Sequence, residues 1–213
     1  MREWNDVPAA AAELLEQDRR GDWRGEPGEI VLLPLGREAT IEDLRRVRGK
    51  AEIVGGQLLL IGPAGGLPGL AAGQIAFSLS GYEKQHGGGI AFTSRVGYVV
   101  DLPNRKSFCP DASWYTGPST RADFPQGAPV FAVEVRDLHD YGRPYEQYMS
   151  GKRADYFAAG TQVVWDVDVL RAGEIRVYRA SDPETPVIYR RGEIAEAEPA
   201  VRGWRMPVDE LFD

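Results

Sequence analysis

The sequence predicts an α/β protein of the α+β type, with a mixed central β-sheet that helices flank. An apolar run at 129–136, a helical stretch at 145–157 and a second apolar run at 162–167 follow one another. A strand, a helix and a strand in this order favour a parallel crossover. Residues 90–100 and 111–115 have the pattern of neighbouring antiparallel strands. Short strand patterns separated by glycine turns follow the second apolar run, which predicts added β-hairpins.

Composition is typical of a globular chain with one main domain. The 213 residues are 43% hydrophobic and 27% charged, which is enough to bury a sizeable core. We expect a helical extension at 1–39 and one domain at 40–213. Cys109 is the single cysteine, which fits a reducing cytoplasm. The first residues lack the pattern of a secretory signal, and no apolar run approaches the length of a membrane span.

The N-terminal part predicts several short elements. An alanine-rich pattern from Val7 to Arg20 predicts a helix, and residues 29–34 predict a strand. Thr40 is expected to cap a short helix through Arg48, with Asp43 three residues further on in the capping-box position.

A hairpin and a long helix follow. Two apolar runs within residues 51–61 surround Gly55-Gly56, which predicts a tight turn. The glycine-rich segment 62–69 lacks the Gly-Lys-Ser/Thr ending of a phosphate-binding loop, so it is interpreted as a flexible connection. Residues 70–85 then predict a helix.

Three residues between Phe108 and Lys152 predict an active site. Pro110 cannot lie inside a central strand, so Asp111 is expected at the start of one, with its carboxylate at a sheet end. Glu134 is the one charge within an apolar strand. Lys152 lies on the same helical stripe as four aromatic and apolar residues, Tyr145, Tyr148, Met149 and Tyr156.

These residue types suit a metal-dependent phosphodiesterase. A carboxylate inside a sheet costs several kcal/mol, roughly, unless it is paired or bound to a cation. Asp111 and Glu134 could share Mg²⁺, which typically takes one or two carboxylates and leaves positions for water and phosphate. The Lys152 ammonium could then stabilise negative charge at a scissile phosphate.

Each residue also has a simpler interpretation. Asp after Pro is a common turn signal. Glu134 could pair with Arg136 or Arg143, and Lys152 could extend from a helix face into solvent. The net charge of −7 counts against broad attraction to nucleic acid. Basic residues still gather locally, at Arg45, Arg46, Arg48 and Lys50, at Arg95, Arg105 and Lys106, and at Arg136, Arg143, Lys152 and Arg153.

From about Thr40 onward the chain resembles the Uma-two family, a branch of the PD-(D/E)xK nuclease superfamily to which restriction endonucleases belong. The resemblance rests on several short pieces, namely residues 51–58, Pro110-Asp111, Val133-Glu134-Val135, Lys152 followed by Tyr156, Phe157 and Gly160, residues 164–168, and the segment from Gly203-Trp204 to Leu211-Phe212. It implies a restriction-endonuclease-like core and Mg²⁺-dependent hydrolysis of DNA, with Mn²⁺ as an alternative ion.

Carried over residue by residue, Asp111 matches the motif aspartate and Glu134 the motif acid. Arg136 stands where the superfamily has lysine, and Lys152 resembles the displaced lysine of this branch. Glu52 matches the glutamate of the early hairpin and is expected to assist the acidic pair. Analogy with related nucleases also suggests a homodimer.

The leading hypothesis is therefore a Mg²⁺-dependent endonuclease that cuts DNA. The alternative is a nuclease-fold module that has lost its chemistry and binds DNA or protein. Hydrolysis of another phosphodiester is a third hypothesis.

Overall fold

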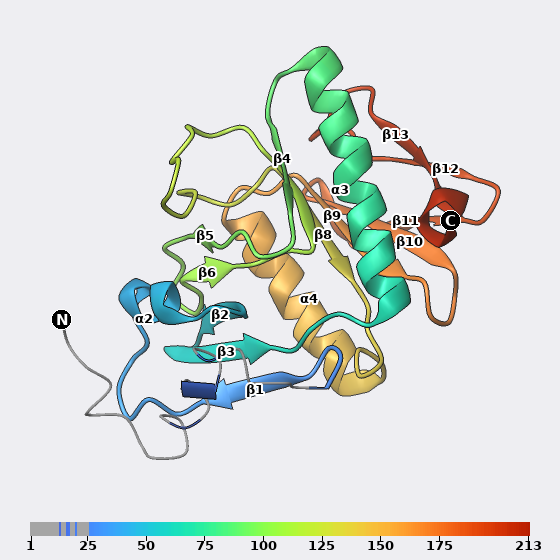
Figure 1. Ribbon diagram of the computed structural model, residues 1–213. Coiled ribbons are helices and arrows are strands. Elements are labelled where there is room, and N and C mark those ends of the chain that lie inside the picture. The colour runs from blue at the N-terminus through green and yellow to red at the C-terminus, as the bar shows by residue number, and fades with distance from the viewer. Residues whose placement is uncertain (1–12, 14–15, 18–19, 21–25) are drawn as a thin grey trace.

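A six-stranded mixed sheet forms the centre of the protein in the computed structural model, which describes residues 13, 16–17, 20 and 26–213 (Figure 1). The strands lie in the order β11-β10-β9-β8-β7-β4. β8 and β9 are parallel, and the other neighbours are antiparallel. The bounds are β4 Ile90–Thr93, β7 Ala112–Tyr115, β8 Phe131–Val135, β9 Val163–Asp168, β10 Glu174–Arg179 and β11 Asp182–Arg190. The expected α+β fold with a mixed sheet is confirmed.

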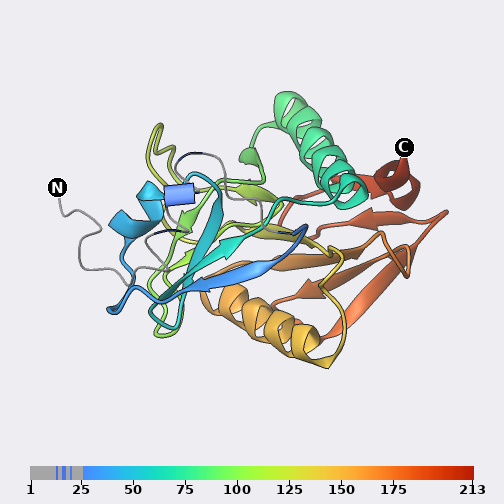
Figure 2. The same cartoon turned by 60° about the horizontal axis from the view of Figure 1, so that its bottom comes forward.

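Two helices cover opposite faces of this sheet, α3 (Gly66–His86) and α4 (Arg143–Ala158) (Figure 2). Side chains of β8 alternate between them, as the two-residue period of a strand requires. Val133 belongs to the cluster that contains Ile75 of α3, whereas Ala132 packs in the cluster of Tyr156 of α4. Glu134 lies on the α4 side, because it accepts a hydrogen bond from Tyr156. Its burial follows from a central strand covered on both faces.

A small sheet in the order β1-β3-β2 forms a second layer beside α2 (Ile41–Arg46). Its strands are β1 Ile30–Leu33, β2 Lys50–Val54 and β3 Gln57–Ile61. Gly55 and Gly56 have φ of 58° and 72°, the left-handed conformation that a two-residue hairpin turn needs. The capping box at the start of α2 is present, so both expectations are confirmed. This sheet has its own core of leucine and isoleucine, which comprises Leu33, Leu44, Ile53, Leu58 and Leu60.

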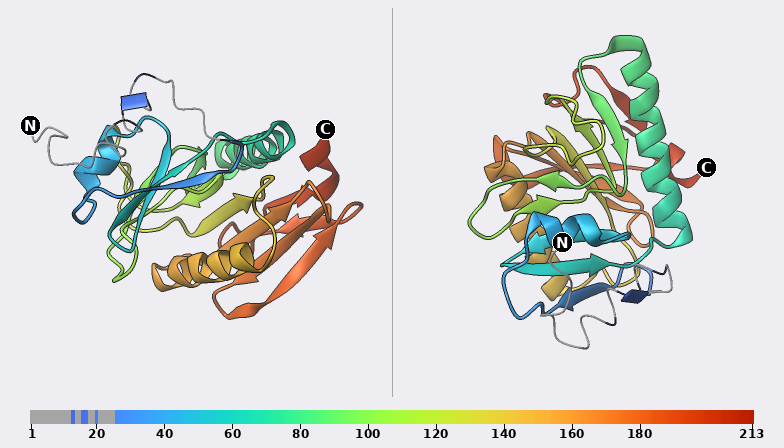
Figure 3. Two further views of the ribbon diagram at one scale, coloured as in Figure 1. Left: turned by 90° about the horizontal axis from the view of Figure 1, so that it is seen from below. Right: turned by 60° about the vertical axis from the view of Figure 1, so that its left-hand side comes forward.

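The remaining strands extend both ends of the molecule. β5 (Tyr98–Val99) pairs with β6 (Ser107–Phe108), and β12 (Ile194–Glu196) pairs with β13 (Arg205–Pro207). The 3-10 helix η2 (Val208–Phe212) closes the described chain. Figure 3 shows β1–β3 and the C-terminal hairpins at opposite ends of the central sheet.

Two expectations about these elements were wrong. Helix α3 begins at Gly66, inside the segment interpreted as a flexible connection, because Pro68 falls in the first turn, where its missing N–H has no helical partner. The strand expected over 90–100 is interrupted: β4 ends at Thr93, and Arg95 adopts a left-handed φ of 83° before β5 begins in another sheet.

The N-terminal extension is described only in part. The helix expected from Val7 to Arg20 lies, except at four positions, outside the described residues. β1, which falls within the expected extension 1–39, pairs along its length with β3. No helix in the described part of the chain is long and apolar enough to cross a membrane.

Candidate active site

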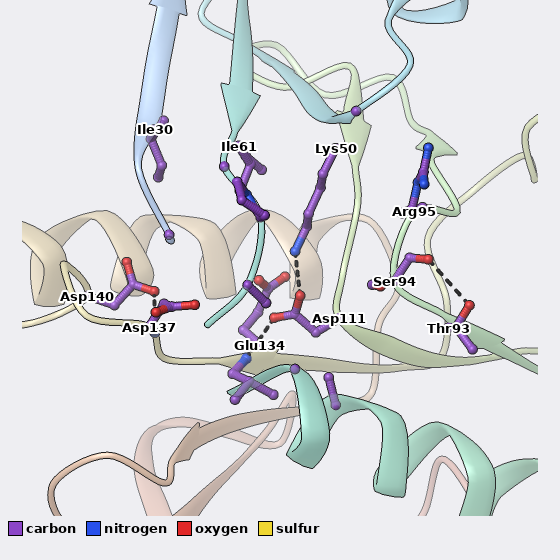
Figure 4. Close-up of a pocket in the computed structure, with 18 of the residues that line it drawn as sticks. Ile30, Lys50, Ile61, Thr93, Ser94, Arg95, Asp111, Glu134, Asp137 and Asp140 are labelled. Atoms are coloured by element: carbon purple, nitrogen blue, oxygen red, sulfur yellow. Dashed lines mark hydrogen bonds and ion pairs between the residues drawn. The ribbon is translucent and has the colours of Figure 1, made fainter. Parts of the chain in front are cut away.

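A cleft of about 770 Å³ lies between the small sheet and the central sheet. Ile30, Lys50 and Ile61 line it from the small sheet, Asp111 and Glu134 from the central sheet (Figure 4). Helices α3 and α4 contribute Ala72, Gly73, Tyr148, Met149 and Lys152. The structure therefore brings Asp111, Glu134 and Lys152 together at one cleft, as the sequence predicts.

Asp111 is fixed at the junction of β7 and β8. Its N–H donates to the carbonyl oxygen of Val133 at 2.8 Å, and its Oδ2 accepts from the N–H of Val135 at 2.9 Å. Its Oδ1 lies 2.6 Å from Nζ of Lys50. The carboxylate is thus oriented by a neighbouring strand and paired with a cation across the cleft. Asp111 immediately precedes β7, so the alternative of an isolated turn does not describe it.

Glu134 and Lys152 form a buried ion pair. Nζ of Lys152 lies 2.8 Å from Oε1 of Glu134, and the Tyr156 hydroxyl donates to the same oxygen at 2.7 Å. Only 3% of Lys152 is exposed, so it does not extend into solvent. Both contacts fall on Oε1, so Oε2 of Glu134 is the oxygen that can take a further ligand.

Glu52 lies behind Lys152, outside the residues that line the cleft. Its Oε1 is 2.9 Å from Nζ of Lys152 and accepts from the N–H of Cys109 at 2.9 Å. Its Oε2 accepts from Nη1 of Arg105 at 2.6 Å, and Arg105 also binds Asp155. Glu52 is therefore placed to orient Lys152.

The electrostatics of the two glutamates differ although they share Lys152. Burial raises the pKa of Glu134, and the opposing attraction of Lys152 and Lys50 does not overcome it. Burial would also raise the pKa of Glu52, but Lys152 and Arg105 together outweigh it and lower that pKa to about 2. Desolvation would lower the pKa of Lys152, yet Glu134 and Glu52 hold it well above its usual range. Lys152 therefore carries its positive charge at neutral pH.

Arg136 does not serve the cleft. Its guanidinium donates to both carboxylate oxygens of Asp166, at 2.6 and 2.8 Å, and to Glu146. The alternative in which Glu134 pairs with Arg136 is therefore wrong. Arg136 acts here as a structural link between the end of β8, β9 and α4.

The sequence analysis did not predict that Lys50 pairs with Asp111 at the cleft. Lys50 stands two residues before Glu52 at the start of β2, and it was noted only as one of several basic residues. Strand periodicity places alternate side chains on one face, so its spacing from Glu52 was the available signal. Its acidic partner is 61 positions away in the chain, which no local pattern shows.

The cleft is charged unevenly along its length. Figure 4 shows Arg95 on one side of the Asp111 and Glu134 pair, and Asp137 and Asp140 on the other. The Arg95 guanidinium donates to the carbonyl oxygen of Arg48 at 2.5 Å, which holds it at the rim. Phosphate groups are thus favoured on the Arg95 side.

The donor set is compatible with Mg²⁺, although it is sparse. Among the described residues no group of three or more histidine, cysteine or acidic side chains is arranged to hold a metal ion. Two carboxylates are nevertheless what Mg²⁺ commonly takes from a protein, with water and substrate in the remaining positions. Asp111 and Glu134 both line the cleft and supply hard oxygen donors.

The six-stranded mixed sheet with α3 and α4 on its two faces is the core of a restriction-endonuclease-like fold. The chain belongs to the Uma2 family, whose sequence profile, described as "Putative restriction endonuclease", matches residues 40–209.

A solved structure supports this fold. It is a protein from Anabaena variabilis described as "a putative nuclease belonging to DUF820". It superposes with a TM-score of 0.65 over 82% of this chain and 97% of its own, at 14% sequence identity. No curated protein matches the chain.

Proposed function

We propose that the protein hydrolyses DNA phosphodiester bonds in a reaction that depends on Mg²⁺. The observation that carries the proposal is the convergence of Asp111, Glu134 and Lys152 on one cleft from β7, β8 and α4. The family match and the nuclease fold support hydrolysis of nucleic acid as the reaction class.

Asp111 and Glu134 are the residues that would hold the cation. A bound divalent cation would supply charge stabilisation at the phosphate. The N–H of Val135 orients Asp111, and Tyr156 together with Lys152 fixes Oε1 of Glu134. The two carboxylates therefore need little rearrangement before a substrate enters.

Lys152 acts as a fixed positive charge. Because its pKa is raised, it keeps its proton near neutral pH and cannot accept one from water. Its role is to stabilise negative charge that develops on the attacked phosphate. Glu52, held by Arg105, limits the movement of the ammonium and so positions it.

One observation favours a second function, a noncatalytic module that binds DNA or protein. Both oxygens of Asp111 already have partners, Lys50 and the N–H of Val135. A site whose acids are all paired with protein groups binds a metal weakly. Calorimetry with Mg²⁺ and Mn²⁺ separates the two functions, since the module should bind neither ion.

Cleavage of supercoiled, linear, single-stranded and branched DNA, assayed in parallel with and without Mg²⁺, tests the proposal. The protein should cut at least one substrate only with the ion present, and Glu134→Gln should not cut. Equal activity with a chelator, or no cleavage of any substrate despite bound metal, would contradict it. Two copies of the site would let a homodimer address both strands of a duplex, and light scattering on the same preparation tests whether the protein is a dimer.

A further inference from the structure

Lys50 reaches into the cleft from the small sheet and contacts the carboxylate that the proposed function assigns to the cation. Its Nζ lies 2.6 Å from Oδ1 of Asp111. The two side chains are 14% and 15% exposed, so the pair lies at the mouth of the buried cluster (Figure 4). A cation and the Lys50 ammonium would thus compete for one oxygen.

The acids of the cluster are already paired with cationic side chains without any added ion. Its three acids each contact a cation: Asp111 contacts Lys50, Glu134 contacts Lys152, and Glu52 contacts Lys152 and Arg105. A divalent cation placed beside Asp111 with Lys50 still there would meet a like charge at close range. Either Lys50 must leave, or an anion must arrive.

Of the two lysines in this cluster, Lys50 is the one that can move. Lys152 contacts two acids and is 3% exposed. Lys50 has one acidic partner within ion-pair distance in the described chain, and it lines the open cleft. Its four-carbon stem can swing the ammonium without moving β2.

We propose that Lys50 couples cation binding to phosphate binding: it occupies Asp111 when no cation is present, and it transfers to the substrate phosphate when a divalent cation takes Asp111. This inference rests on the proposed function for the identity of the two ligands. Lys50 then has an anionic partner in both states. Cation and phosphate must consequently bind with positive coupling, which is reciprocal by linkage.

Calorimetric titration of the full chain with Mg²⁺ tests the proposal without measuring cleavage. The anionic probe is a phosphorothioate-linked thymidine dinucleotide, which carries one hydrolysis-resistant phosphate diester. The probe should tighten Mg²⁺ binding to the parent protein by about tenfold, within the range of ordinary coupling. Lys50→Met should bind Mg²⁺ alone about tenfold more tightly than the parent, and the probe should no longer tighten it.

Lys106→Met is the matched control. Lys106 also pairs with an aspartate at 2.6 Å, Asp101, but it lies outside the cleft, so its loss should change neither quantity. If Lys50→Met does not fold, Lys50→Gln replaces it in the experiment, because glutamine keeps a neutral donor for Asp111. The results expected for Lys50→Met are then expected for Lys50→Gln. Lys50 variants that bind Mg²⁺ no more tightly than the parent, or that retain the full effect of the dinucleotide, would overturn the proposal.

The two proposals can fail separately. If the Lys50 variants lose the coupling but the parent cuts no DNA, the Lys50 inference holds and the proposed nuclease activity fails. If the parent cuts DNA in a metal-dependent reaction, but the Lys50 variants bind Mg²⁺ with the same affinity as the parent, only this inference fails. Absence of Mg²⁺ binding in both the parent and the Lys50 variants would overturn the inference and the metal dependence together.

Discussion

Lys152 of α4 and Glu52 of β2 meet at 2.9 Å, and this contact joins the small sheet to the helix that covers the central sheet. Glu52 is fully buried and Lys152 is 3% exposed. Lys152 reaches Glu134 as well, so one ammonium connects an acid that lines the cleft with an acid that does not. In the proposed function, Glu52 is therefore assigned to positioning Lys152, and Asp111 and Glu134 to holding the cation.

Glu52→Gln should destabilise the fold by about 3 kcal/mol, the scale for removing one partner of a buried ion pair. The Arg105 guanidinium would keep Asp155 but would lose its buried carboxylate. Chemical denaturation at neutral pH measures the loss. Glu174→Gln is the control: Glu174 also pairs with arginines, but Arg190 is largely exposed, so its loss should cost less.

The stability lost in Glu52→Gln should depend on pH. The folded pKa of Glu52, about 2, lies below its ordinary value of 4.5. Its contribution to the free energy of unfolding is therefore present above about pH 4.5 and is lost as the pH falls toward 2. The stability difference between the parent and Glu52→Gln should shrink over this window. A constant difference from pH 7 to pH 2 would contradict the assignment.

Glu134→Gln should leave the metal-free protein as stable as the parent at neutral pH, or more stable. The reason is that burial raises the pKa of Glu134, so its ionised form is disfavoured in the fold, and this cost grows as the pH rises through the raised pKa. Lys152 keeps Glu52 as a partner. In thermal unfolding, Mg²⁺ should raise the Tm of the parent and not of Glu134→Gln.

Glu146→Gln is the matched control for this experiment, because Glu146 is paired with Arg136 and lies outside the cleft. Mg²⁺ should raise its Tm as it does for the parent. A large loss of Tm in metal-free Glu134→Gln would instead show that the Glu134 and Lys152 pair is a structural ion pair.

Local signals in the sequence predicted the mixed sheet and singled out Asp111, Glu134 and Lys152, which the structure places at one cleft. The continuous apolar run around Glu134 indicates a strand buried on both faces, and the helical spacing of the aromatic stripe of α4 marks the face that carries Lys152. Pairings between distant segments were not readable. The Lys50 and Asp111 pair depends on the small sheet docking against the central sheet, and the Arg105 and Glu52 pair depends on β2 lying beside the turn between β5 and β6. No spacing in the sequence encodes either arrangement.

Arg95→Asn should weaken binding to single-stranded DNA and lower the slope of log affinity against log salt by about one, as expected for losing one phosphate contact. Arg95 lines the cleft and has a left-handed φ of 83°, which asparagine tolerates. Fluorescence anisotropy of a labelled oligonucleotide without metal measures both quantities. The parent affinity should itself be weak at physiological salt and should fall as salt rises, because it depends on a few cationic side chains of the cleft.

Arg121→Asn is the control for the backbone change, since Arg121 is exposed, lies outside the cleft and has a φ of 54°. It should leave the affinity and the salt slope unchanged. Equal effects of the two substitutions would show that Arg95 has no special contact with the strand.

Lys152→Met tests the central catalytic assignment. Methionine keeps an unbranched side chain and a high helix propensity while it removes the charge. Because Glu134 would lose its ion-pair partner and Glu52 would keep only Arg105, we expect lower stability in the absence of metal. Cleavage should slow by about 10²-fold or more, the scale for losing one donor to the transition state. Single-turnover cleavage under saturating Mg²⁺, at a temperature where the variant is folded, measures the change.

The double variant Lys152→Met/Glu52→Gln separates catalysis from folding. It removes one positive and one negative charge from the buried cluster, so it should recover part of the stability that Lys152→Met loses. If Lys152 acts on the phosphate, cleavage by the double variant stays slow despite the recovered fold. If the rate returns with the stability, Lys152 is a structural residue. Lys50 would then be the next residue to test, because Arg136 is held by Asp166 and Glu146 outside the cleft, whereas Lys50 lines it.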